Sequence, residues 1–321
     1  MTFRNRLRRY QHSLLATLAA MALAACGGGG GAASSTAVED VQAFAAAATV
    51  TTTTAAVTKV AFANSDGQAL QGFLFTDAAA SQRQAAVVLL HGCSGVWSNS
   101  VVNTEPQPPQ KALSHIHRRW ATMLAQAGYT VLLVDSFTTR GLANECGNGT
   151  GGLDEAVVRP RDALAGRQWL LGTGHAAPDR IALIGWSHGA SATLATMDRT
   201  NEGTPGARPF REAFAFYPGC GLLSNFGGDA STPAKTSWMP YAPVTVHHAQ
   251  LDPLFTDGRC ANRVAGAPAL AAMQVHAGAR HSFDQIDLAK PLAAPYTASD
   301  QAAQTAADAA VLQRLATLFP L

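Results

Sequence analysis

One short segment constrains the fold of this chain more than any other: the turn Gly185-Trp186-Ser187-His188-Gly189. It follows a predicted strand, Arg180–Trp186, and opens a run of small residues, Ser187–Met197. A glycine-flanked serine in this context is typical of a tight strand-to-helix turn that holds the serine above the edge of a sheet. The N-terminus of the following helix favours negative charge there. The segment predicts a serine nucleophile, although a turn without catalysis has the same pattern.

Apolar runs alternate with helical patterns along most of the chain. Continuous apolar runs suit strands that are buried on both faces of a parallel sheet. We expect eight strands, over Val57–Asn64, Leu70–Thr76, Ala85–His91, Tyr129–Asp135, Arg180–Trp186, Ala213–Tyr217, Val244–His248 and Leu270–His276. We expect helices over Leu113–Ala127, Arg159–Leu171, Ser187–Met197 and Asp300–Leu318. This alternation predicts an α/β fold for residues 57–321: an eight-stranded, mainly parallel sheet with helices on both faces, an antiparallel edge and no separate cap domain.

Composition excludes two classes of protein. With 47% hydrophobic and 14% charged residues, the chain can bury a sizeable core and is not a disordered protein. The formal net charge is +2, but four arginines lie in the first nine residues. Without them, 19 basic residues face 21 acidic ones, a net charge of −2. The remaining chain has no basic field that would attract nucleic acid.

The first 25 residues resemble a lipoprotein signal peptide. A stretch with four arginines is followed by a short apolar run, Ser13–Ala25, that ends at Cys26. Small residues before this cysteine resemble a lipobox, so we expect cleavage before Cys26, lipid on its thiol, and a flexible tether over residues 26–56. A residue other than aspartate after the cysteine favours the outer membrane, facing the periplasm of a bacterial cell envelope. An ordinary secretory signal with a coincidental cysteine is the alternative.

A serine hydroxyl needs a base to take its proton. His281 follows the last predicted strand and lies in a loop, which is where this arrangement needs the base. Three other histidines, His247, His248 and His276, lie within predicted strands. We therefore predict that His281 is the base for Ser187.

The base needs an acid that holds its tautomer. Asp252 follows the penultimate strand, which makes the chain order Ser, Asp, His. Asp257 is the alternative, but it is better explained as a helix N-cap ahead of Arg259. Asp135 ends an earlier strand and is interpreted as structural.

The transition state carries an oxyanion that needs backbone N–H donors. We expect one donor to be the N–H of His188 and the other that of Cys93, in the loop after the third strand. Without Cys26, four cysteines remain, which suggests disulfides in an exported protein. Of the three possible pairings, position in the fold favours Cys93–Cys146 and Cys220–Cys260. Buried free thiols are the alternative.

The candidate substrate contacts are large side chains near the predicted site. The loops 94–111, 136–153 and 221–241 border the predicted site, and their large side chains can line a pocket, although packing explains each of them at least as well: Trp97, Phe137, Trp238 and Tyr241. Arg140 can hold an anionic group or brace its loop. We see no zinc-type spacing of cysteine or histidine and expect no metal or organic cofactor.

With these residues in hand, the chain resembles the dienelactone hydrolase family of α/β-hydrolases over residues 57–319. The markers are His91-Gly92-Cys93-Ser94-Gly95, Asp135-Ser136-Phe137 with Arg140-Gly141, Gly185-Trp186-Ser187-His188-Gly189, Asp252-Pro253 and His281-Ser282-Phe283. The founding enzymes have cysteine where this chain has Ser187, and a glutamate where its oxyanion loop has His91 and Gly92. Gln285 and Asp287 occupy the neighbourhood of the family's carboxylate-binding arginine.

The resemblance implies an α/β-hydrolase fold and a plain serine esterase rather than a hydrolase of dienelactone itself. We expect a carboxylic ester hydrolase that forms an acyl-enzyme on Ser187 and acts on a small-molecule ester. It would meet the membrane only through its lipid anchor. A peptidase on the same triad and a non-catalytic envelope binding lipoprotein are the alternatives.

Overall fold

The computed structural model describes residues 55–78, 84–98, 113–147, 152–221 and 230–320. The predicted signal peptide, the lipidation site Cys26 and nearly all of the predicted tether lie outside these residues. None of the helices in the described part is both long and apolar enough to cross a lipid bilayer.

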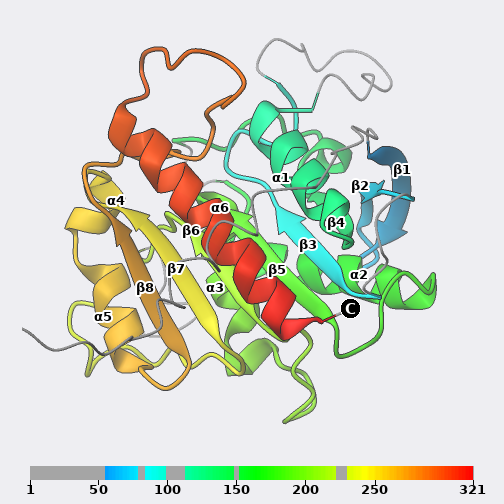
Figure 1. Ribbon diagram of the computed structural model, residues 1–321. Helices are drawn as coiled ribbons and strands as arrows, with labels where there is room; N and C mark the ends of the chain where they lie inside the picture. The colour runs from blue at the N-terminus through cyan, green and yellow to red at the C-terminus, as the bar shows by residue number, and fades with distance from the viewer. Residues whose placement is uncertain (1–54, 79–83, 99–112, 148–151, 222–229, 321) are drawn as a thin grey trace, which may run out of the picture. The chain divides into compact units, whose positions relative to one another are not determined.

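Eight strands form a single sheet in the order β1-β2-β4-β3-β5-β6-β7-β8 (Figure 1). From β4 onward every neighbouring pair is parallel, whereas β2 is antiparallel to both β1 and β4. The bounds are β1 Ala56–Ala63, β2 Ala69–Thr76, β3 Ala86–Leu90, β4 Thr130–Asp135, β5 Ile181–Trp186, β6 Ala213–Phe216, β7 Val244–Ala249 and β8 Ala271–His276. The predicted mainly parallel sheet with an antiparallel hairpin at its edge is confirmed.

Helices cover both faces of this sheet, as predicted. The helices are α1 His115–Gln126, α2 Val158–Gly172, α3 His188–Met197, α4 Pro253–Thr256, α5 Arg259–Gly266 and α6 Ala298–Leu318, with short 3-10 turns η2 Thr138–Arg140 and η4 Arg199–Asn201. The short helix α4 was not predicted, and α5 was indicated only by the interpretation of Asp257 as a helix N-cap, because one and two turns carry too little periodicity to be recognised in the sequence.

Successive residues of the central strands divide the core in two. Val87 and Leu89 of β3 pack with α1 and α6, whereas Val88 and Leu90 pack with α2 and α3. All four side chains are fully buried. This is the two-sided burial that a continuous apolar strand predicts. The described residues from 55 onward belong to one compact unit, with no separate cap domain among them.

The parallel strands β3 to β8 bring their carboxyl ends to one edge of the sheet. The turn after β5 carries Ser187, and the segments after β7 and β8 carry Asp252 and His281. Because ligands in open α/β sheets bind at this edge, the topology places all three candidate residues where a site is expected.

Candidate active site

Ser187 lies in a strained turn between β5 and α3. Its φ is 51° and its ψ is −116°, a conformation that non-glycine residues rarely adopt. The turn is held from both sides: the Ser187 N–H donates to Phe216 O at 2.9 Å, and the Ser187 carbonyl accepts from the N–H of Ala190 at 2.8 Å. A Cβ at Gly185 would lie 2.2 Å from the Gly189 carbonyl oxygen. Close backbone approach thus requires a glycine at position 185.

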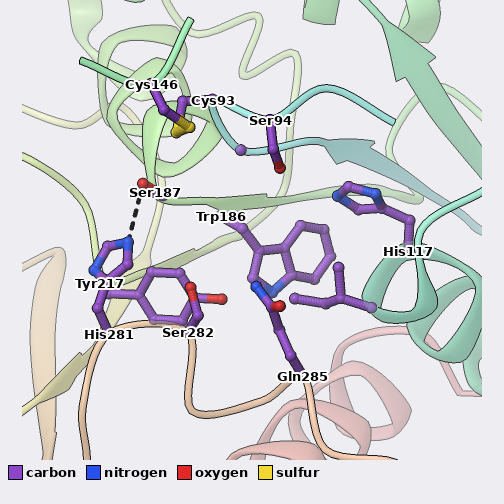
Figure 2. Close-up of a pocket in the computed structure, with 12 residues that line it drawn as sticks. Cys93, Ser94, His117, Cys146, Trp186, Ser187, Tyr217, His281, Ser282 and Gln285 are labelled. Atoms are coloured by element: carbon purple, nitrogen blue, oxygen red, sulfur yellow. Dashed lines mark hydrogen bonds between the residues drawn. A yellow bond between two sulfur atoms is a disulfide. The ribbon is translucent and has the colours of Figure 1, made fainter. Parts of the chain in front are cut away.

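The three side chains predicted as a triad come together (Figure 2 shows the serine–histidine pair). His281 Nε2 lies 3.2 Å from Ser187 Oγ, and His281 Nδ1 lies 2.6 Å from Asp252 Oδ2. Asp252 is buried, and its other carboxylate oxygen accepts the N–H of Leu254 at 2.9 Å. Because Asp252 accepts the hydrogen on Nδ1, the lone pair of Nε2 faces the serine hydroxyl, as general-base chemistry requires.

The other candidate histidines lie elsewhere. His247 stacks between the rings of Phe216 and His276, with centroids 4.7 and 5.6 Å away. Burial lowers the pKa of His247 to about 3, so it stays neutral. His248 lies behind the acid, with Nδ1 3.7 Å from Asp252 Oδ2, a neighbour that the sequence did not indicate. Burial lowers the pKa of His248 as well.

The other two aspartates act on the backbone. Asp257 accepts the N–H of Arg259 at 2.9 Å, and Asp135 accepts the N–H groups of Phe137 and Thr138, each at 3.0 Å. Asp257 therefore caps the first turn of α5, although Gly258 is the N-cap residue itself.

The predicted oxyanion loop lies against the serine turn. A Cβ at Gly92 would contact Trp186 O at 3.4 Å and Ser187 Cβ at 3.7 Å. The next residue, Cys93, is bonded to Cys146 with 4.9 Å between their Cα atoms, and its carbonyl accepts the Glu145 N–H at 2.8 Å. The loop is therefore tied to the segment after β4, which fixes the position of the Cys93 amide.

The second disulfide also follows the predicted pairing. Cys220 and Cys260 are bonded, with 5.1 Å between their Cα atoms. This bridge ties the segment after β6 to α5.

The side chain of His188 is locked away from the serine. Its Nδ1 accepts from Arg159 Nη1 at 2.8 Å, and its Nε2 lies 3.1 Å from both Leu153 O and Glu155 Oε2. Burial and the Arg159 charge lower the pKa of His188 to about 3, so the ring is neutral and carries its hydrogen on Nε2. His188 can therefore offer its backbone N–H, at the start of α3, but is no competing base. The buried Arg159 was not singled out from the sequence.

A cavity of about 220 Å³ lies beside Ser187. Figure 2 shows the Trp186 indole between Ser187 and His117, with Ser94 and Gln285 on opposite sides. The described lining residues are Gly92, Cys93, Ser94, Ile116, His117, Cys146, Trp186, Ser187, Tyr217, His281, Ser282 and Gln285. None of these carries a carboxylate, an ammonium or a guanidinium group. Burial lowers the pKa of His117 to about 3, so this ring is neutral too.

The candidate substrate contacts lie outside the described wall of the cavity, which contains none of Trp97, Phe137, Arg140, Trp238 and Tyr241. All but Arg140 are buried in packing. The indole N–H of Trp97 donates to Thr138, and that of Trp238 to Leu194 O. Tyr241 belongs to the same core cluster as Trp238.

Phe137 and Arg140 have internal partners as well. The Phe137 ring packs edge-on against the rings of His91 and His188. Arg140 is held by two hydrogen bonds to Asp162, at 2.8 and 2.9 Å. Arg140 therefore braces its loop and is not free to hold a substrate anion.

His117 lines the cavity but was not predicted, whereas Gln285, which also lines it, was noted only as occupying the neighbourhood of the family's carboxylate-binding arginine. His117 carried a recognisable signal: it is a polar residue on the core-facing side of a helix, between Ile116 and Trp120. Gln285 lies in an irregular segment without periodicity, so only the resemblance to the family pointed to it. Among the described residues no three His, Cys, Asp or Glu side chains are grouped as metal ligands.

Comparisons with known proteins bear on the family and the fold of the chain. The model of the "Dienelactone hydrolase family" matches residues 70–319. No curated protein matches the chain. A dienelactone hydrolase-like promiscuous phosphotriesterase from metagenomic libraries is 21% identical, with a TM-score of 0.57, over 82% of this chain and 99% of that one.

Two further solved structures have similar statistics. A putative dienelactone hydrolase from Klebsiella pneumoniae is 17% identical over 82% of this chain and 98% of its own, with a TM-score of 0.51. A Pyrobaculum calidifontis esterase is 16% identical over 82% and 86%, with a TM-score of 0.52. At these identities the likeness shows the α/β-hydrolase fold.

Proposed function

This chain belongs to the dienelactone hydrolase family, and from that premise we propose that it is a serine hydrolase that cleaves carboxylic esters. Membership of the family and its esterase-like neighbours support a hydrolase. The observation that carries the finer assignment is the unbroken chain of contacts from Asp252 through His281 to Ser187, beside a cavity.

The proposed reaction begins with proton transfer from Ser187 Oγ to His281 Nε2 while Oγ bonds to the ester carbonyl carbon. The carbonyl oxygen becomes an oxyanion, which the N–H groups of Cys93 and His188 stabilise. Collapse of the tetrahedral intermediate breaks the bond to the alcohol oxygen, which takes the proton from His281. Water then attacks the acyl-enzyme with the same histidine as base, releases the acid and restores the Ser187 hydroxyl.

The cavity indicates the class of ester. Its described lining has no charged side chain to bind a carboxylate, and His117 stays neutral. A buried ion without a partner is costly, so we propose that the group bound here is uncharged. The Trp186 and Tyr217 rings supply flat apolar walls, which suit a compact aryl or short acyl group.

The proposal is tested with a panel of p-nitrophenyl esters and a fluorophosphonate probe on the mature protein. We expect turnover of short neutral esters, labelling of the folded protein, and loss of both in Ser187→Ala by several orders of magnitude in rate. Ser191→Ala is the matched control. Ser191 lies in the first turn of α3, the helix that follows Ser187, but it donates to Gly219 O and is not among the described residues that line the cavity. A folded protein that is neither labelled nor active would leave the alternative of a non-catalytic binding protein.

Peptide anilides added to the same panel separate an esterase from a peptidase on the same triad. We expect kcat/KM for the neutral esters to exceed that for the anilides by orders of magnitude. The reverse ranking would replace the esterase assignment with that of a peptidase.

We also propose that the protein is exported and carries lipid on Cys26. The basic and apolar segments before this cysteine support the proposal, and the two disulfides are consistent with an oxidising compartment. Mass spectrometry of the protein extracted from bacterial membranes would detect a diacylglyceryl group on Cys26. A soluble product cleaved at another site would contradict the proposal.

A further inference from the structure

A fully buried carboxylate, Asp284, lies beneath the proposed site. Its Oδ2 accepts the indole N–H groups of Trp120 and Trp186, both at 2.8 Å, and its Oδ1 accepts the Tyr217 hydroxyl at 2.6 Å. These donors come from α1, from the end of β5 and from the residue after β6. One side chain therefore joins three separate elements.

Packing alone does not explain this arrangement. Taking a carboxylate out of water is costly, and a well-packed apolar group of similar size commonly costs less. The described residues place no cationic side chain on the Asp284 carboxylate. Arg119, which comes close, donates instead to the Asp284 backbone carbonyl and to Asp308. Three neutral donors satisfy the carboxylate, and their directions fix the orientation of each donor ring.

Two of the three donors touch the triad. Trp186 directly precedes Ser187, and the Tyr217 ring lies 4.6 Å from the His281 ring, centroid to centroid (Figure 2). Both rings line the cavity. Burial and the neighbouring Asp284 raise the pKa of Tyr217 well above its usual value, so its hydroxyl remains a donor.

Tyr217 also adopts a strained backbone conformation. Its φ is 43°, and its N–H donates to His247 O at 2.7 Å. A non-glycine residue keeps such a conformation only where its surroundings hold it firmly. The hydrogen bond to Asp284 is one of the contacts that do so.

We propose that Asp284 is a positioning residue. By fixing the rings of Tyr217 and Trp186, it holds the His281 ring in position relative to Ser187. Asp284 lies three residues after His281, so the base and its support share one segment. The 3.2 Å contact between His281 Nε2 and Ser187 Oγ depends on the position of the His281 ring. Misplacement by about 1 Å can cost about 100-fold in rate.

The experiment compares Asp284→Asn, Tyr217→Phe and the double variant. An asparagine offers one acceptor oxygen where three donors converge, and phenylalanine keeps the ring of Tyr217 but removes its hydroxyl. We expect each change to lower kcat for p-nitrophenyl acetate about tenfold or more per active site titrated with fluorophosphonate, with KM changed less than about threefold. The double variant should be little worse than the poorer single variant, because the hydrogen bond that Tyr217→Phe removes is one of those that Asp284→Asn disturbs.

Trp238→Phe is the matched control for loss of a buried indole hydrogen bond. Its N–H donates to Leu194 O at 2.8 Å in the other core cluster. We expect this variant to lose stability but to keep kcat per titrated site. That split separates positioning of the base from general support of the fold.

This inference rests on the proposed function, and the outcomes distinguish the two. Wild-type protein that neither turns over the ester nor takes the label at Ser187 overturns both. Two outcomes with active wild type overturn the positioning role alone. One is an unchanged kcat in Asp284→Asn and Tyr217→Phe. The other is a double variant in which the two losses of kcat multiply, as for independent sites. If Asp284→Asn does not fold, kcat of Tyr217→Phe decides.

Discussion

At the scale of single residues, the tautomer of His281 is the property on which the proposed chemistry depends most. Asp252→Asn would present an amide N–H₂ or a weaker acceptor to Nδ1 and favour the tautomer with hydrogen on Nε2. That tautomer cannot accept the Ser187 proton. We expect kcat to fall about 10³- to 10⁴-fold, as judged by the effect of this change in a related triad, and stopped-flow hydrolysis of p-nitrophenyl acetate would measure it.

Asp257→Asn is the control, since this aspartate lies in the same segment but accepts the Arg259 N–H. It should keep nearly full activity. A loss of less than tenfold in Asp252→Asn, or an equal loss in both variants, would show that the acid is misassigned.

The uncharged cavity predicts a change of selectivity at Gln285. Gln285→Arg would place a guanidinium beside a cavity whose described lining has no other ionic group. We expect kcat/KM for a mono-carboxylate ester to rise about tenfold relative to its neutral methyl-ester analogue, since a desolvated ion pair of this kind is worth about 1–3 kcal/mol. Gln285→Met supplies the comparison of similar length without charge. Equal selectivity in both variants would mean that the substrate does not reach this end of the cavity.

At the scale of elements, the serine turn and the oxyanion loop form one tightly packed unit. A Cβ at Gly189 would lie 2.2 Å from Leu90 O and 2.4 Å from His91 O, the carbonyls that lead from β3 into the oxyanion loop. Gly189→Ala must displace this backbone, so we expect a loss of about 3 kcal/mol in stability together with a fall in kcat.

Gly172→Ala tests that reasoning in reverse. A Cβ at Gly172, at the end of α2, meets nothing within 4 Å, so alanine there should be neutral or slightly stabilising. Thermal unfolding and kcat of the two variants would measure the difference. Equal unfolding temperatures would contradict the packing argument.

Loss of either disulfide should lower the stability of the protein by a similar amount, but the two losses should differ in their effect on activity. They close loops with sequence separations of 53 and 40 residues, so loss of either should cost about 4 kcal/mol by loop entropy. Replacing Cys93 and Cys146 by alanine should also lower kcat, because Cys93 is the proposed oxyanion donor. Replacing Cys220 and Cys260 should lower stability with kcat nearly unchanged, as urea unfolding and initial rates would show.

The elements that sequence predicted best are those whose pattern is local. Each strand of the parallel sheet is a short apolar run, and its bounds in the structure differ from the predicted ones by a residue or so at either end. The triad was predictable because every member follows such a run in the chain order that the fold requires. In contrast, nothing local to Asp284 indicates that indoles from α1 and β5 converge on it.

At the scale of the whole molecule, the cavity could not be predicted from local sequence patterns either. The side chains that line it come from six separate parts of the chain, and their selection depends on how α1 and the segment after β8 pack at the sheet edge. The aromatic residues of the bordering loops were predicted weakly as contacts. These side chains are buried in the protein core instead, as Trp238 and Tyr241 are in the second core cluster, because burial of a large aromatic ring is strongly stabilising.

The histidines buried in this molecule make its stability depend on pH. Burial lowers the pKa values of His117, His188 and His247 to about 3, whereas an unfolded histidine titrates near pH 6.5. Between these values the unfolded chain binds protons that the folded protein does not. Their stabilising contribution is therefore complete above about pH 6.5 and is lost as the pH falls. Burial lowers the pKa values of His91, His115, His248 and His276 as well. Asp308 and Glu155 act in the opposite direction, because burial raises the pKa of Asp308 to about 6 and also raises that of Glu155, but two carboxyl groups do not cancel the larger number of histidines.

We therefore expect the free energy of unfolding to fall steeply between about pH 6 and pH 4, by about 3 kcal/mol per pH unit for every two net protons. Urea unfolding at half-unit pH intervals would measure this slope. His247→Phe removes one titrating ring but keeps an aromatic ring stacked on Phe216. The slope of its unfolding free energy against pH should therefore be shallower by about one proton. At pH 7.5 the stability of this variant should differ from that of the wild type far less than at low pH. A wild-type slope near zero in this range, or an unchanged slope in His247→Phe, would show that these rings do not control the acid stability. We expect a slope because protonation would place cations in buried surroundings in the folded state, whereas the same rings are hydrated in the unfolded chain.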